Sequence, residues 1–237
     1  MQNIWVITKR ELGSYFVSPI AYAVGAAFLV LSGLFFILPF FLGSSDASLR
    51  GWMQTIVVLL LFIAPMFTMK LLAEERQTGT IELLLTSPVR DWEVVIGKFL
   101  AALGLWLAIL ALTLVYPIAL KIFGNPDIVP LVTGYLAMVL MGAAMLAVGV
   151  LSSAVSPNQI VAVVVGFAIL LVLWIAAPLQ NVFGGQVGSI VAYLSLTDHM
   201  GDLMKGVVDS RDIIYYLSVV VGCLFVSTRI LETRRWS

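Results

Sequence analysis

The segment Glu74-Glu75-Arg76-Gln77-Thr78-Gly79-Thr80-Ile81-Glu82-Leu83-Leu84-Leu85-Thr86-Ser87-Pro88-Val89 separates two long apolar runs of the chain. It carries four charged side chains between Glu74 and Glu82, although charged residues make up only 11% of the protein. After Glu82 the segment becomes apolar, and it stops at a proline. A polar insert between two apolar runs is where a membrane protein meets a soluble partner, so we expect membrane-spanning segments on both sides.

The composition of the whole chain supports this expectation. Hydrophobic residues make up 61% of the sequence, and the mean hydropathy is +1.08. A soluble domain carries roughly 25% charged residues, more than twice the fraction found in this chain. We therefore predict a polytopic membrane protein in contact with the lipid bilayer. The formal net charge is zero, and we expect no nucleic-acid partner.

Six apolar runs are long enough to cross a membrane, because a helix needs about 20 apolar residues to span the hydrocarbon core. They cover approximately 20–42, 53–72, 97–121, 129–153, 159–178 and 213–231. None of the six contains an internal Asp or Glu. The sequence therefore predicts an all-α polytopic membrane protein with six transmembrane helices in one domain, residues 1–237.

The distribution of basic residues predicts the orientation of these spans. With six spans, both termini lie on one side, and nine of the 13 Lys and Arg residues fall on that side. We therefore expect both termini to be cytoplasmic, in a bacterial inner membrane. The first apolar run, 20–42, is too long for the core of a signal peptide and reads as a retained span.

Residues 1–19 precede the first span and have the pattern of an interfacial helix. Their apolar side chains fall within an arc of about 120° on a helical wheel. The arc contains Ile4, Trp5, Leu12, Tyr15 and Phe16. Arg10 and Glu11 fall on the opposite side. This pattern favours a helix lying in the plane of the membrane surface over a frayed tail.

The segment 179–212 is the longest part of the chain outside the predicted spans. Residues 182–196 are apolar and rich in glycine, whereas residues 197–212 are polar. The apolar part is too short to cross the bilayer twice, so it predicts a short re-entrant or interfacial helix. The polar part holds His199, the one histidine of the chain, near Ser195. A catalytic histidine and an exposed or loop-capping histidine both remain open, and we favour the second.

The motifs of common energy-converting and catalytic sites are missing from the sequence. It contains no GxxxxGK[ST] phosphate loop, no HExxH and no Cys/His cluster of metal-ligand spacing. The predicted spans lack the acidic and histidine groups that ion-coupled carriers place inside the membrane. We expect a non-catalytic subunit without cofactors, to which a partner supplies energy. Cys223 lies in an apolar run and is expected to be a packing residue.

Within the opening segment, Thr78-Gly79-Thr80 is suited to end one helix and to start another. Leu83 and Leu84 follow with the pattern of a short amphipathic helix, which Pro88 would end. Three consecutive leucines in a short loop need burial against the membrane or a partner. This requirement favours a docked helix over an ordinary solvated loop.

Two further patterns concern the packing of the spans. Pro65 lies inside the second run and predicts a kink. Small residues recur at four-residue spacing and predict close helix packing or a dimer interface. The pairs are Gly97 with Ala101, Gly104 with Ala108, and Ala143 with Ala147.

The chain resembles the membrane subunit of type-2 ABC exporters. The resemblance rests on EERQTGTIELLLTSPVRDWEVVIGKFL, residues Glu74–Leu100, and on the six-span architecture with an N-terminal interfacial helix. The tail Asp198–Trp236, with KGVVDSRD and a final LETRRW, is similar to the gliding-motility branch of this family. The resemblance covers nearly the whole chain.

The resemblance implies that 74–92 is a cytoplasmic coupling segment whose short helix docks on a separate ATPase subunit. The implied docking residues are Glu74, Glu75, Arg76, Gly79, Glu82, Leu83, Leu84, Leu85 and Pro88. The segment 179–212 would form an outer gate. The implied gate residues are Asp198, His199, Asp202 and Lys205. The family pairs two permease chains, identical or homologous, with two ATPase subunits that bind ATP.

These features imply a permease subunit that couples ATP hydrolysis by its partner to export of an amphipathic or polymeric substrate. The alternative is a mechanical or scaffolding subunit whose ATPase-driven motion acts on an external partner. In the gliding-motility branch, a further membrane subunit with a large external domain often accompanies the permease. An intramembrane enzyme is disfavoured because the spans lack acid–base groups. The sequence leaves the identity of any substrate open.

Overall fold

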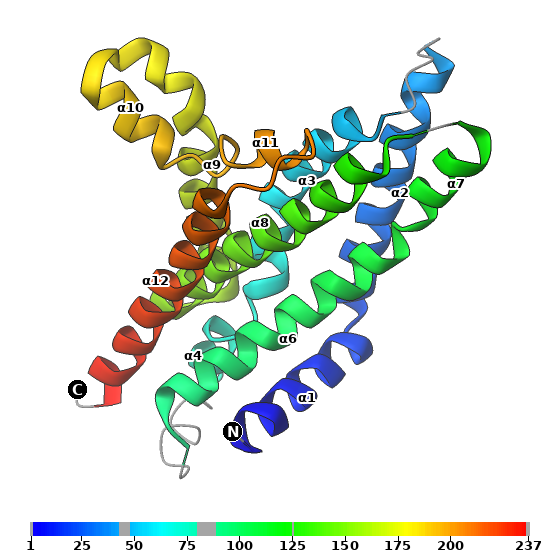
Figure 1. Ribbon diagram of the computed structural model, residues 1–237. Helices are drawn as coiled ribbons and strands as arrows, with labels where there is room; N and C mark the ends of the chain where they lie inside the picture. Colours follow the sequence, from blue (N-terminus) through cyan, green and yellow to red (C-terminus); the bar gives the residue numbers. More distant parts are fainter. Residues whose placement is uncertain (1, 43–47, 80–88, 125, 236–237) are drawn as a thin grey trace.

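The computed structural model describes residues 2–42, 48–79, 89–124 and 126–235, and helices are the only regular elements in these ranges (Figure 1). The helices are α1 (Gln2–Val17), α2 (Pro19–Phe41), α3 (Arg50–Thr68), α4 (Ala73–Gln77), α6 (Asp91–Leu112), α7 (Val115–Phe123), α8 (Ile128–Val155), α9 (Gln159–Phe183), α10 (Gly185–Tyr193), α11 (Met200–Leu203) and α12 (Ser210–Arg235). The expected helix between Thr80 and Pro88 lies outside the described residues.

Six helical stretches of the described chain are long and apolar enough to cross a membrane. They are Pro19–Phe41, Arg50–Gln77, Asp91–Ile122, Ile128–Val155, Gln159–Leu179 and Ser210–Thr233. The prediction of an all-α polytopic membrane protein with six transmembrane helices is confirmed.

The third span is broken near one end, where Pro117 lacks the N–H that would bond the Thr113 carbonyl four residues earlier. α6 ends at Leu112 and α7 begins at Val115, so the chain turns at Thr113 and Leu114. The Tyr135 hydroxyl of α8 donates a 2.9 Å hydrogen bond to the Thr113 carbonyl. This bond satisfies a backbone oxygen that the break exposes inside the membrane.

Three helix boundaries follow from local sequence. α2 begins with Pro19 at its first position, where the missing N–H costs nothing. Asn158 accepts a 2.9 Å hydrogen bond from the Val161 N–H at the start of α9, as expected for a cap. After α4, Gly79 adopts φ +72°, a left-handed conformation that favours glycine.

α8 is the central helix of the bundle and packs against α3, α6, α9 and α12 (Figure 1). It approaches its neighbours closely through three glycines. Gly134 faces Met53, Gly142 faces the Trp106 indole, and Gly149 faces Thr68. At each of these positions an added Cβ atom would overlap the neighbouring side chain.

Two of the predicted small residues, Gly97 and Gly104, contact another helix of the same chain, whereas Ala108 is exposed. Gly97 packs on Ile7 of α1, where an added Cβ would lie 2.8 Å from the Ile7 side chain. Gly104 lies about two turns further along the same face of α6 and packs against Leu12 of α1. Ala101, between them, is fully buried. This row of small residues on α6 is therefore the surface on which the N-terminal helix packs.

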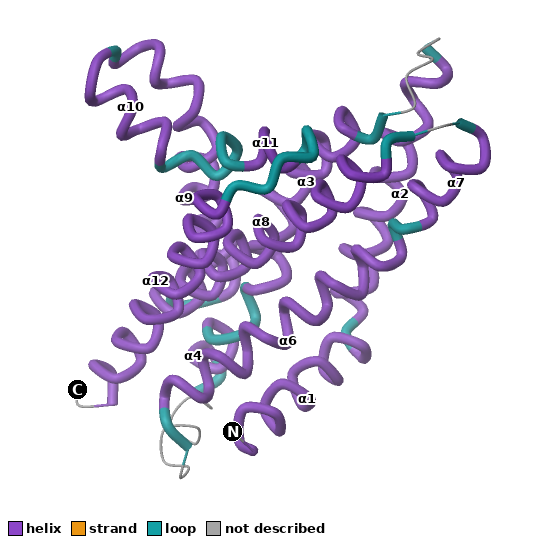
Figure 2. The backbone as a smooth tube through the Cα atoms, in the orientation of Figure 1, coloured by secondary structure: helices purple, strands orange, loops and turns teal. Residues whose placement is uncertain are grey.

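α1 is packed against α6 on one side and exposed on the other (Figure 2). Trp5 and Phe16 of the predicted apolar arc are exposed, at 70% and 52%, whereas Tyr15 is buried. The Tyr15 hydroxyl donates a 2.5 Å hydrogen bond to the Phe67 carbonyl. Glu11, which the helical wheel put on the solvent side, faces the bundle. The wheel failed here because α1 packs on a polar part of α6, where Lys98 pairs with Glu11.

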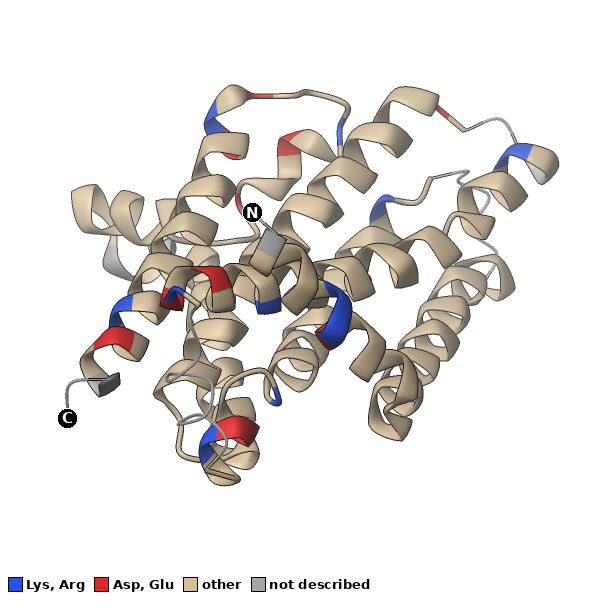
Figure 3. Cartoon of the chain, turned by 90° about the horizontal axis from the view of Figure 1, so that it is seen from below, with Lys and Arg blue, Asp and Glu red and all other residues tan. Residues whose placement is uncertain are grey.

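Both termini and α4 lie at one end of the bundle, and α7, α10 and α11 lie at the other (Figures 1 and 2). This arrangement follows from an even number of spans. Lys, Arg, Asp and Glu residues occupy only short, separate stretches of the backbone (Figure 3).

Gly142→Ala should destabilise the bundle. Its new methyl group would overlap Trp106, which is fully buried and cannot move aside. Overpacking of this kind costs about 1–3 kcal/mol. Gly222→Ala is the matched control, because nothing lies within 4 Å of the added Cβ. Thermal unfolding in detergent should show a lower Tm for Gly142→Ala alone, and equal values for the two variants would contradict the packing described here.

Candidate functional site

The chain between α3 and α4 is held by one side chain of α8. The Ser153 hydroxyl accepts hydrogen bonds from the backbone N–H groups of Leu72, at 3.1 Å, and Ala73, at 3.0 Å. It donates a third, of 3.1 Å, to the Met69 carbonyl. These three bonds use the full capacity of a hydroxyl. α8 therefore fixes the backbone that leads into the predicted coupling segment.

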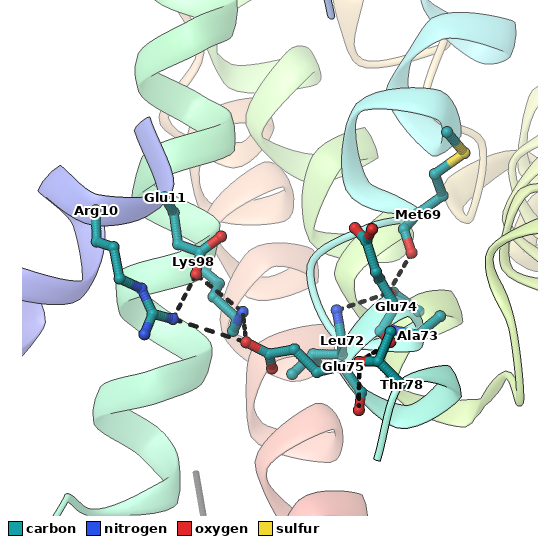
Figure 4. A network of polar contacts seen from close by, with 10 residues as sticks. Arg10, Glu11, Met69, Leu72, Ala73, Glu74, Glu75, Thr78 and Lys98 are labelled. Atoms are coloured by element: carbon teal, nitrogen blue, oxygen red, sulfur yellow. Dashed lines mark hydrogen bonds and ion pairs between the residues drawn. The ribbon is translucent and has the colours of Figure 1, made fainter. Parts of the chain in front are cut away.

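A buried ion cluster lies beside this turn (Figure 4). Lys98 of α6 is only 1% exposed, and its Nζ lies 2.8 Å from Glu75 of α4 and 3.2 Å from Glu11 of α1. Arg10 contacts the same two carboxylates, at 2.7 Å from Glu11 and 3.7 Å from Glu75. Two cations and two anions thus join α1, α4 and α6.

Charge balance makes this cluster stable. Burial tends to raise the pKa of Glu11, but Lys98 and the Arg10 hydrogen bond outweigh it, so the pKa lies below its ordinary value. A carboxyl group whose pKa is lowered by folding stabilises the fold above its unfolded pKa. That contribution is lost as the pH falls through the lowered value. The cluster is therefore intact at neutral pH.

The other end of the predicted coupling segment is also anchored. Glu93 in the first turn of α6 accepts hydrogen bonds from the Arg90 backbone N–H, at 3.1 Å, and from Asn3 of α1, at 3.2 Å. The Thr8 hydroxyl contacts the Gly97 carbonyl at 3.1 Å. We call Glu11, Glu75, Glu93, Lys98 and Ser153 the anchor cluster. It holds both points at which the chain enters and leaves 80–88.

The predicted docking residues divide into three groups. Glu75 points into the anchor cluster, and Glu74 is half-buried. Arg76 and Gly79 are exposed, and the Arg76 guanidinium donates a 3.1 Å hydrogen bond to the Val155 carbonyl. The rest of the set lies outside the described residues, namely Glu82, Leu83, Leu84, Leu85 and Pro88. Docking by these residues stays a prediction.

The predicted gate residues at the opposite end also differ in their surroundings. Asp202 and Lys205 form an exposed ion pair of 2.8 Å, and the Lys205 hydrogen bond lowers the pKa of Asp202. Asp198 is exposed. His199 is buried, and its Nδ1 lies 2.8 Å from Asp212 of α12.

The geometry around His199 does not fit a catalytic base. Its Nε2 faces the Tyr193 carbonyl at 3.1 Å, and the Ser195 hydroxyl is paired with Thr197 at 2.9 Å. No nucleophile is aligned with the ring among these neighbours. The histidine instead fastens a loop, and it does so from a buried position rather than an exposed one. Among the described residues, no cluster of three or more His, Cys, Asp or Glu side chains is placed to hold a metal ion.

The apolar part of 179–212 forms a hairpin with the fifth span. α9 ends at Phe183, and Gly184 and Gly185 turn the chain with φ +59° and +55°. α10 then packs back against α9. A pocket of about 300 Å³ lies between α3, α9 and α11. Its lining residues are Gln54, Val57, Val58, Trp174, Pro178, Thr197, Met200, Gly201 and Met204.

Three residues of these sites were missed by sequence reasoning. Lys98 lies at the start of an apolar run, which was a signal that its charge needs a partner. Ser153 lies at the end of the fourth apolar run, and Asp212 lies just before the sixth. Each depends on contacts between distant parts of the chain.

Lys98→Met should destabilise the protein by about 3–5 kcal/mol, because it removes the buried cation that contacts both Glu11 and Glu75, whereas their other cation, Arg10, is 59% exposed. Lys205→Met is the matched control, since its ion pair is exposed and worth about 0–1 kcal/mol. Thermal unfolding in detergent at neutral pH checks this. A Tm for Lys98→Met as high as that of the control would show that the cluster does not hold α1 and α4 to α6.

Comparison with known proteins adds to this geometry. A search of curated proteins found no match. The family model described as ABC-2 family transporter protein matches residues 42–219, which is most of the chain and includes all of the coupling segment. The chain therefore belongs to the ABC-2 family of transporter proteins.

Proposed function

We propose that this protein is the transmembrane permease subunit of an ATP-driven exporter, in which residues 80–88 dock on the ATPase. Membership of the ABC-2 family makes the chain a permease component of an ABC transporter, which works with an ABC ATPase subunit. The anchor cluster is the observation that carries the finer proposal. It fixes both ends of the docking segment to the bundle, so that a force on the segment reaches the spans.

The force would reach the bundle by two routes. Ser153 connects the turn before α4 to α8, the central helix. The ion pairs of Lys98 connect α4 to α6 and α1. A segment attached to the bundle at one point could move independently of it, whereas a segment attached at both ends passes its displacement on to the bundle. This is the physical requirement for coupling hydrolysis to a change in the spans.

The opposite end of the bundle has features suited to an outer gate. α11 roofs the 300 Å³ pocket, whose lining is mainly apolar and includes Val57, Trp174 and Met200. An apolar pocket binds the apolar part of a ligand, and few polar groups orient it. This lining supports an amphipathic substrate, such as a lipid-linked glycan or peptide.

The remaining parts of the proposal concern assembly and orientation. Both termini lie at the end that carries most of the basic residues, which supports a cytoplasmic location for that end in a bacterial inner membrane. α9 and α12 are only 22% and 17% buried, so large faces remain for lipid or a second permease chain. Two ATPase subunits and, as in the gliding-motility branch, an additional membrane subunit would complete the complex.

Glu82→Lys combined with Leu84→Asp should abolish co-purification with the ATPase subunit, because it reverses a charge and puts a carboxylate on the apolar docking face. Asp127→Lys with Ile128→Asp is the control at the opposite end of the bundle. Both control residues are exposed, and Asp127 makes no side-chain cap. Retention of the ATPase by the first variant would rule out docking through this segment.

Ser153→Ala should leave the ATPase bound but lower the ATPase rate of the reconstituted complex severalfold. It removes three hydrogen bonds and leaves two backbone N–H groups buried and unpaired. Ser152→Ala is the control, because the Ser152 hydroxyl bonds only within α8, to the Gly149 carbonyl. Equal rates in the two variants would show that α8 does not receive the force.

Transport itself needs a separate measurement. Purified complex in liposomes should move a fluorescent lipid-linked glycan when ATP is supplied, and it should stop when ATP hydrolysis is blocked. ATPase activity without movement of any such cargo, together with dependence on an external protein, would replace export by the mechanical function.

A further inference from the structure

The surroundings of His199 carry an inference beyond transport. The ring is buried, and both of its nitrogens face oxygen atoms. Nδ1 lies 2.8 Å from the Asp212 carboxylate, and Nε2 lies 3.1 Å from the Tyr193 carbonyl. The Tyr193 carbonyl can only accept hydrogen bonds, and the same holds for the Asp212 carboxylate when it is ionised. A neutral imidazole has one N–H and can satisfy only one of them, whereas an imidazolium satisfies both.

We propose that His199 is a proton-binding site, and that its doubly protonated form locks α10 and α11 to α12 over the apolar pocket. The lock joins three elements, because Tyr193 ends α10, His199 precedes α11, and Asp212 lies in the first turn of α12. Met200, next to His199, lines the pocket. Its role as a gate control rests on the proposed export function, but the proton site itself does not.

The aromatic groups around the ring fix its orientation. His199 stacks on Tyr215 with ring centroids 3.9 Å apart, and Tyr193 meets its edge at 5.1 Å. The Tyr215 hydroxyl donates to the Leu194 carbonyl at 2.7 Å, and the Tyr216 hydroxyl donates to the Leu196 carbonyl at 2.7 Å. The ring therefore cannot turn to find other partners when it loses a proton.

Several charged groups lie near the ring. Asp212, in the first turn of α12, is in direct contact with it. Asp198 is adjacent in the sequence, and Asp202 is paired with Lys205. Arg211 is a cation of the same region, with its guanidinium 4.8 Å from the Tyr193 ring centre. α8 and α9, which pack against α11 and α10, contain no Asp, Glu, Lys or Arg.

The direction of the pH effect follows from these contacts. Histidine changes charge between about pH 5 and 8, the range in which few other groups do. Loss of the Nδ1 proton would turn a lone pair toward a carboxylate, so the proton must leave from Nε2. The bond to Tyr193 is then replaced by repulsion between two acceptors. α10 and the start of α11 should loosen as the pH rises, while the Asp212 bond persists.

The decisive test uses the one histidine of the chain. Protein with ¹⁵N-labelled histidine and a tag free of histidine is placed in lipid nanodiscs, where both faces meet the same buffer. Nitrogen NMR near about pH 5.5 should show both ring nitrogens protonated, within the range in which histidine titrates. As the pH is raised, Nε2 alone should lose its proton. A neutral ring at the low pH, or loss of the proton from Nδ1, would overturn the proposal.

Hydrogen exchange gives the second measurement. Peptides covering 193–204 should exchange faster at high pH than at low pH after correction for the intrinsic chemical rate. His199→Gln and Asp212→Asn should remove this step, because neither can form the charged pair. Lys205→Gln should keep it, since its ion pair is exposed. The same step in His199→Gln would assign the effect to another group and reject the lock.

The two proposals fail separately. A proton bound at His199 in a complex that moves no cargo would leave the site intact and remove only its role in export. If the complex transports its cargo while the His199 ring stays neutral at every pH, the export proposal stands and the proposed lock is rejected.

Discussion

The pairing of Lys98 with Glu11 and Glu75 is the interaction on which the arrangement of the anchor end depends. A lysine that is 1% exposed at the edge of a membrane span is costly unless a carboxylate neutralises it. The two carboxylates come from α1 and α4, and Arg10 of α1 balances the second of them, so the full cluster forms only when both helices are docked on α6. Several hydroxyls of the spans are also paired, because Thr68, Ser152 and Ser227 donate to carbonyl groups of their own helices.

The opposite end is held by different forces. There the contacts are an aromatic stack, tyrosine hydroxyls bound to backbone carbonyls, and a single His–Asp pair. The ion pairs of Lys98 and Arg10 with Glu11 and Glu75 join three helices at one end of the bundle. At the other end, the contacts around His199 join α10, α11 and α12. The two ends are therefore held by different kinds of contact.

Features with a local cause could be predicted from the sequence. The six spans follow from hydropathy. Asn158 is a residue type that often caps the start of a helix, and Gly79 is a residue type that often ends a helix in a left-handed conformation. The burial of Lys98 and of His199 could not be predicted, because each depends on residues more than ten positions away. The break at Thr113 was also missed, although Pro117 lies four residues later and cannot donate a backbone hydrogen bond to the Thr113 carbonyl. The hydroxyl that bonds this carbonyl comes from Tyr135 of another helix. The inward face of α1 was missed for the same reason, because it depends on packing against the row of small residues on α6.

The length of α8 has a mechanical consequence. The helix has 28 residues and is therefore about 42 Å long at 1.5 Å per residue. Ser153 lies near one end, and α11 packs against the helix toward the other. Its glycines bring Met53, Trp106 and Thr68 so close that the helix has little freedom to slide or to compress. α8 can thus act as a lever pivoting at its middle. A tilt of about 5° would displace each end by about 2 Å in opposite directions, given the rise per residue of an α-helix. A shift that small is comparable to the reach of a hydrogen bond, so it is large enough to make or break the contacts around His199.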